Sequence, residues 1–77
     1  MPRYYFDTVD GRAETDSVGE EFKNVAAAQN FAVSYSGSVL KDRPEIAAAP
    51  QGFRVHVLDE NRRPLLSVVT TVSRTSD

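Results

Sequence analysis

Residues 24–41 carry apolar side chains at the spacing of an amphipathic helix. The stripe recurs every three or four residues and consists of Ala28, Phe31, Ala32, Tyr35 and Val39. Asn24 can cap the start of this helix, because its side-chain oxygen can accept a hydrogen bond from a free amide of the first turn. Pro44 disfavours helical geometry in the residue before it. The pattern therefore predicts one helix whose stripe lies in the core.

The part of the chain before this helix is rich in strand-forming residues. Residues 3–9 contain aromatic and β-branched side chains, with apolar residues on both faces. This composition favours a strand that is central in a sheet or covered on both sides. Asp10 and Gly11 then mark a turn. Residues 21–22 are predicted to form a short second strand that pairs back on the first.

The part of the chain after the helix predicts a β-hairpin. Residues 44–52 form a connection that can hold one helical turn before Pro50. Residues 53–59 and 65–72 both alternate with a period of two, and a turn at residues 60–64 joins them. The inward positions of the first of these two strands are Phe53, Val55 and Val57.

The predicted elements follow one another in the order β, short β, α, β, β. We therefore expect an α+β fold with two layers, a ββαββ arrangement in which one helix packs on a small, mainly antiparallel sheet. A length of 77 residues favours a single domain over residues 1–77, with a frayed tail at residues 73–77. The order of the strands within the sheet stays open at this stage.

A single helix covers only one face of such a sheet, which leaves the other face open. The alternation places four apolar side chains on the open face: Tyr5, Leu58, Leu65 and Val69. A contiguous apolar patch needs a cover, and a chain this short buries only about 60% of its unfolded surface. We therefore expect a homodimer through this face, or through strand pairing at a free sheet edge. A monomer is the alternative, because polar side chains share the same face.

The charge of the chain argues against nucleic-acid binding. The net charge is −2, and the arginines of the second hairpin are interrupted by Asp59 and Glu60. A small regulatory protein that binds nucleic acid is therefore only the second candidate function. No apolar segment approaches the roughly 20 residues that a membrane-spanning helix needs. The opening residues lack the layout of a signal peptide, so the expected location is cytoplasmic.

Candidate catalytic and metal-binding residues are few. The chain has no cysteine, and its one histidine, His56, stands beside no nucleophile motif. A loose acidic cluster lacks the spacing of a calcium loop and consists of Asp7, Asp10, Asp16, Glu20 and Glu21. We therefore expect no enzyme activity, no cofactor and no metal site. The predicted function is a non-enzymatic protein-interaction module with an unidentified protein partner.

Three pieces of the chain carry a resemblance to a known family: residues 1–7 (MPRYYFD) with Asp10-Gly11, residues 16–22 (DSVGEEF) and residues 57–65 (VLDENRRPL). They resemble a family of short bacterial stand-alone proteins, the domain of unknown function 6894. The resemblance implies a ββαββ domain and no particular activity.

This chain departs from the family pattern in two places. The helix is less charged, since Ala28, Gln29 and Phe31 stand where the family has an Ala-Arg pair followed by an acidic residue. Arg62 stands where the family usually has glycine, which implies a positive φ at that position. The conformation of the turn at Asn61–Arg62 is therefore left open.

Overall fold

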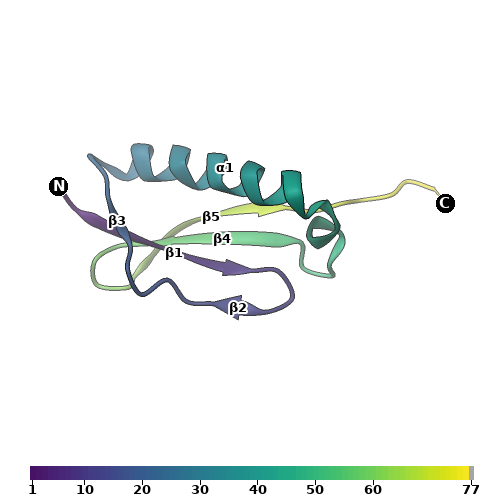
Figure 1. The fold of residues 1–77 in the computed structure, drawn as a ribbon, viewed down its shortest axis with the longest axis horizontal. Helices are drawn as coiled ribbons and strands as arrows, with labels where there is room; N and C mark the ends of the chain where they lie inside the picture. Colours follow the sequence, from purple (N-terminus) through teal and green to yellow (C-terminus); the bar gives the residue numbers. More distant parts are fainter. Residues whose placement is uncertain (77) are drawn as a thin grey trace.

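The computed structural model describes residues 1–76 as one helix packed on an antiparallel sheet (Figure 1). The elements are β1 (Arg3–Val9), β2 (Ala13–Glu14), β3 (Glu20–Glu21), α1 (Val25–Asp42), the 3₁₀ helix η1 (Pro44–Ala48), β4 (Phe53–Leu58) and β5 (Pro64–Thr70). The strand order is β2-β1-β4-β5, and β3 pairs with the other end of the outer edge of β1. The predicted two-layer α+β fold is confirmed, and β2 is an additional strand. The last residue of the predicted frayed tail, Asp77, lies outside the described residues, and residues 73–76 belong to no helix or strand.

The two short strands complete the outer edge of β1. Gly11 adopts a φ of 100° in the turn after β1, and this turn brings Ala13 and Glu14 back beside Val9 and Thr8. The sequence pattern did not predict β2, because both of its residues are exposed and neither carries an apolar periodicity. β3 begins one residue earlier than predicted. The ladder continues past β3, where the amide of Phe22 donates to the carbonyl of Pro2 at 3.0 Å.

The helix begins and ends close to the predicted residues. The side chain of Asn24 accepts a hydrogen bond from the amide of Ala27 at 2.9 Å, which confirms the predicted N-cap. The buried residues of α1 are spaced four apart and are Ala28, Ala32 and Ser36. These small side chains let α1 approach the sheet closely above β4 and β5 (Figure 1).

Tyr35 does not belong to the buried stripe, contrary to the prediction. Its side chain is 39% exposed and lies on the flank of α1, where its ring stacks on that of Phe31 at 6.2 Å between centroids. Ser36 takes the core position instead. The residues that contact the sheet are the small ones spaced four apart, and this spacing continues from Ala32 to Ser36 and not to Tyr35. Phe31 fulfils its predicted role, since its ring packs edge-on against that of Phe6 at 4.9 Å.

The core lies between α1 and the facing side of the sheet. Its largest fully buried side chains are Phe53, Val55 and Val57, as the alternation predicted. β1 contributes Tyr4 and Phe6. The connection after the helix also supplies a core residue, because η1 places Ile46 against this cluster.

Ser36 provides a test of this packing. Its hydroxyl is buried and has no hydrogen-bond partner among the described residues. A buried hydroxyl without a partner costs about 1–3 kcal/mol, so Ser36→Ala is expected to raise the free energy of unfolding by about 1 kcal/mol or more. Ser34→Ala, at an exposed position of the same helix, isolates the gain in helix propensity, which is about 0.5 kcal/mol. Urea denaturation of both variants measures the difference, and equal gains would contradict an unpaired hydroxyl.

Candidate functional site

The open face of the sheet carries the residues predicted for self-association, but in separate places. Tyr5 and Leu58 lie directly opposite each other on β1 and β4, and both are half-buried. Val69 lies opposite Arg54 near the other end of the sheet and is 45% exposed. A register shift pairs Pro64 with Leu58, and Leu65 lies in this irregularity. The structure therefore brings Tyr5 and Leu58 together and leaves the other two apart.

Leu65 contributes to a cleft at the end of the sheet. This cleft has a volume of about 300 Å³ and is lined by Pro2, Arg3, Tyr4, Val25, Asp59, Glu60, Asn61 and Leu65. The side chain of Leu65 is 41% exposed there. Leu65 and Val69 thus share one feature, which is that both are exposed apolar residues of the edge strand β5.

A polar row separates the apolar parts of the open face. Asp7, His56 and Ser67 are in register across β1, β4 and β5. Nδ1 of His56 lies 2.6 Å from Oγ of Ser67, while the carboxylate of Asp7 contacts Arg62 at 2.6 Å. In a nucleophilic triad the histidine bridges the serine and the carboxylate. Over residues 1–76, no ion pair joins Asp7 to His56, so the row does not have that arrangement.

Asp16 closes the middle of the outer edge of β1. Its Oδ2 accepts a hydrogen bond from the amide of Phe6 at 3.1 Å, in the gap between the pairings with β2 and β3. Its Oδ1 accepts from the amides of Val18 and Gly19, each at 3.0 Å. Gly19 has a φ of 70°, and a Cβ at this position would lie 2.7 Å from the carbonyl oxygen of Tyr4. The segment between β2 and β3 therefore lies close against β1.

Arg62 joins the β4–β5 turn to this closed edge. Its φ of 65° confirms the positive value that the family's glycine implied. Its guanidinium contacts the carboxylate of Asp7 at 2.6 Å, donates to the carbonyl of Asp16 at 3.0 Å, and lies over the ring of Tyr5, 5.1 Å from the centroid. These contacts connect the β4–β5 turn to β1 and to the segment after β2, both of which are distant from it in the sequence. They also cover part of Tyr5, one of the four residues predicted for self-association.

The two edges of the sheet differ. The edge of β1 is occupied by two short strands and the carboxylate of Asp16. In the described part of the chain, no strand pairs with the outer edge of β5. β5 has the sequence PLLSVVT, without a charged residue. A long, uncharged free edge is a template for strand addition.

The predicted absence of a metal site stays a prediction. Within residues 1–76, no three histidine, aspartate or glutamate side chains lie close enough to hold a metal ion. Several carboxylates of the predicted acidic cluster have other partners, since Asp10 pairs with Arg43 at 3.2 Å and Glu21 with Arg3 at 3.7 Å.

Asp16 gives the edge closure a pH dependence. Burial raises the pKa of Asp16, but hydrogen bonds from the amides of Gly19, Val18 and Phe6 and the charge of Arg62 outweigh it, so the pKa lies below its ordinary value. Because the folded-state pKa is depressed, this carboxylate stabilises the fold above its unfolded pKa, and the contribution is lost as pH falls through the folded pKa. We expect Asp16→Asn to lower the urea midpoint at pH 7 and to flatten the fall in stability at acidic pH. Asp42→Asn, at an exposed site, serves as the control. Identical pH profiles for Asp16→Asn and the wild type would contradict the role.

Arg62 allows backbone strain to be separated from side-chain contacts. Both Arg62→Gly and Arg62→Ala remove the guanidinium contacts, but only glycine relieves the positive φ. Arg62→Gly is therefore expected to be more stable than Arg62→Ala by about 1 kcal/mol. Denaturant unfolding of the two variants measures this difference. If alanine were tolerated as well as glycine, the left-handed conformation would impose no strain.

Comparison with known proteins identifies the family. The family model described as Domain of unknown function (DUF6894) matches residues 3–71. Searches of curated proteins and of solved structures gave no significant match. α1 is not apolar enough to cross a membrane, and no other described helix is long enough. Since the match runs from the start of β1 past the end of β5, the chain belongs to the DUF6894 family.

Proposed function

We propose that this protein is a non-enzymatic interaction module that forms a homodimer by pairing β5 with β5 of a second copy. The observation that carries the proposal is the contrast between the two sheet edges. One edge is closed by short strands and Asp16, and the other is β5, a strand of seven residues with no strand on its outer side in the described chain. Natural proteins usually protect the edges of their sheets, and Pro64 and the register shift beside it protect only the first residues of β5. The unprotected remainder of this edge indicates a partner.

The composition of β5 suits pairing with itself. Antiparallel pairing about a two-fold axis satisfies the outward amides and carbonyls of both strands and continues the sheet across the dimer. β5 has no charged residue, so no like charges are brought opposite each other. The exposed side chains of Leu65 and Val69 would lie beside those of the second copy. Pairing of this kind adds apolar burial to a small core.

The helix layer offers a second contact in the same dimer. Val33 is 54% exposed on the flank of α1 opposite Phe31, because two residues correspond to about 200° of rotation. Phe31 packs toward β1, so Val33 lies on the side of the helix nearer β5. Two-fold pairing of the edges places both helices on the same face of the joined sheet, with these flanks toward each other.

A role in nucleic-acid binding is the weaker candidate. Three of the arginines are neutralised in ion pairs, namely Arg3 with Glu21, Arg43 with Asp10 and Arg62 with Asp7. Binding to phosphates requires free cations gathered on one surface. The proposed module acts through a protein partner, and the cysteine-free chain is compatible with the proposed cytoplasmic location.

Self-association is tested by light scattering after size-exclusion chromatography. We expect the mass of a dimer at tens of micromolar protein (on the order of a typical laboratory concentration), and a monomer for Val69→Glu and Leu65→Glu with unchanged circular dichroism. Two-fold symmetry introduces two such carboxylates into one interface, and burying a charge without a partner is strongly unfavourable. Val18→Glu, an exposed valine beside the closed edge, is the matched control and stays dimeric.

Two outcomes would contradict edge pairing. One is a monomer mass for the wild-type protein at these concentrations. The other is a dimer that Leu58→Glu disrupts while Val69→Glu leaves it intact, since that result would place the interface on the open face around Tyr5 and Leu58. Hydrogen exchange gives an independent readout, because edge pairing protects the outward amides of β5.

A further inference from the structure

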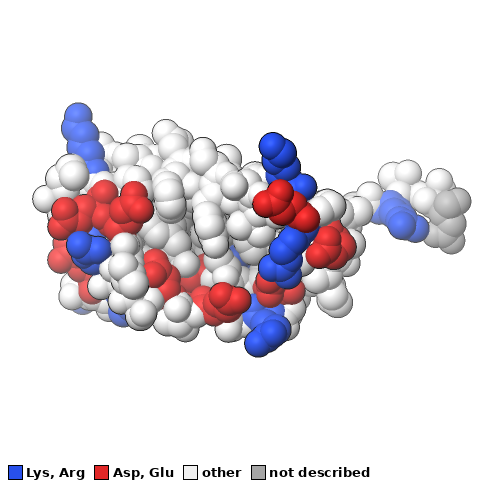
Figure 2. Space-filling view, in the orientation of Figure 1, with Lys and Arg blue, Asp and Glu red and all other residues white. Residues whose placement is uncertain are grey.

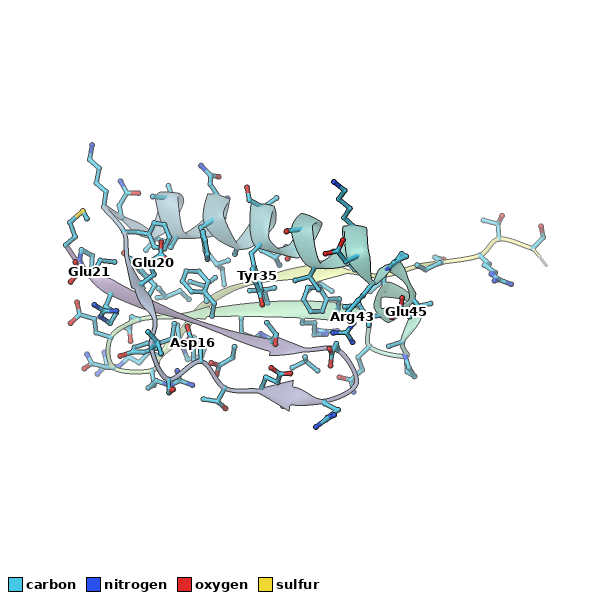
Figure 3. All side chains as sticks on the ribbon, in the orientation of Figure 1. Asp16, Glu20, Glu21, Tyr35, Arg43 and Glu45 are labelled. Atoms are coloured by element: carbon cyan, nitrogen blue, oxygen red, sulfur yellow. The ribbon has the colours of Figure 1, made fainter. Side chains whose placement is uncertain are left out.

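A groove runs between α1 and the segment that closes the edge of β1. It has a volume of about 290 Å³ and is lined by Phe6, Thr8, Glu14, Thr15, Asp16, Gly19, Glu20, Phe31 and Tyr35. Figure 3 shows Tyr35 directed from α1 toward the strands, with Asp16 and Glu20 on the segment facing it. The groove exists because α1 lies above β4 and β5, so part of β1 is left uncovered by the helix (Figure 1).

One wall of the groove is aromatic. The rings of Phe31 and Tyr35 are stacked, with an interplanar angle of 14°, and Phe6 lies edge-on to Phe31 beneath them. Phe6 is buried, but Tyr35 remains 39% exposed. An exposed aromatic face has a negative electrostatic potential, which attracts a cation.

The opposite wall is acidic. It carries the carboxylates of Glu14, Asp16 and Glu20, and none of the residues that line the groove is a lysine or an arginine. Glu14 and Glu20 take part in no ion pair within the described chain, whereas the neighbouring Glu21 pairs with Arg3. In Figure 2, acidic side chains lie along the lower part of this face and at both of its ends, where basic side chains stand among them.

We propose that this groove binds the side chain of a lysine or an arginine on a partner protein. Aromatic rings on one wall and carboxylates on the other are complementary to an organic cation with an apolar stem. The volume suits one long side chain and is at the lower limit for small-molecule sites. Phosphates and carboxylates are repelled by the acidic wall. A metal ion is the less suitable occupant, because no three acidic or histidine side chains within residues 1–76 lie close enough to hold one, and both carboxylate oxygens of Asp16 already accept amide hydrogen bonds.

The test uses three blocked pentapeptides that differ at the central residue, with arginine, lysine or glutamine between glycines. ¹⁵N-labelled protein is titrated with each peptide. We expect the arginine and lysine peptides to shift the amides of Gly19, Glu20 and Tyr35 saturably, and the glutamine peptide to leave them unchanged. Tyr35→Ala and Glu20→Gln are expected to weaken binding about threefold or more each. Glu21→Gln, whose carboxylate pairs with Arg3 outside the groove, is the matched control and binds as the wild type.

Equal shifts with the glutamine peptide, or none with any of the three, would overturn the proposal. So would binding that Glu21→Gln weakens as much as Glu20→Gln, since general attraction to an acidic surface would then explain it. The spectra of both groove variants also report whether the fold is retained. We expect it to be retained, because Tyr35 and Glu20 are at exposed positions. The same titration on the Val69→Glu variant separates this inference from self-association, because the groove lies at the edge of the sheet opposite β5.

Discussion

The closed edge of the sheet depends on the hydrogen bonds that the carboxylate of Asp16 accepts. By accepting the amide of Phe6, it occupies the part of β1 that neither β2 nor β3 reaches. By accepting the amides of Val18 and Gly19, it also sets the path of the chain into β3. The closed edge and part of the acidic wall of the groove follow from this one side chain, while Arg62 donates to the backbone carbonyl of the same residue. Since, against the effect of burial, hydrogen bonds from amides and the charge of Arg62 lower the pKa of this carboxyl, its contribution to stability is expected to be lost at acidic pH.

The position of the helix depends on the size of the side chains that face the sheet. Ala28, Ala32 and Ser36 form the closest contact line with the sheet, so the larger rings of Phe31 and Tyr35 lie to one side. Small residues allow a short distance between layers, and aromatic side chains fill the wider space at the flank. The groove and its aromatic wall therefore result from packing, and the opposite flank is free for a second copy.

The two proposed surfaces use different parts of the fold. The proposed self-association would use the backbone and apolar side chains of β5, and the proposed cationic partner would contact side chains of α1 and the closed edge. Because the two surfaces lie at opposite edges of the sheet, both could be occupied at once. A dimer would then present two grooves, and a partner with two basic residues would bind more tightly through the increase in effective concentration.

Local periodicity by itself determined the main elements. The helix, β1 and the β4–β5 hairpin were predicted within a few residues, because each buries one face and its apolar side chains repeat at the period of its own backbone. The inward side chains of β4 and the Asn24 cap follow from the same local rules. The family resemblance added the positive φ of Arg62.

Only the tertiary structure decided the features that carry the proposals. β2 has two exposed residues and no apolar pattern, so its pairing depends on the turn at Gly11. The four residues predicted for self-association share an alternation, but the register separates Val69 from Tyr5, and an irregularity in β5 displaces Leu65. Asp16 stood in the sequence as one of several turn carboxylates. Its role arises because folding brings it against an amide ten residues earlier in the chain, and a contact of that kind leaves no periodic signal.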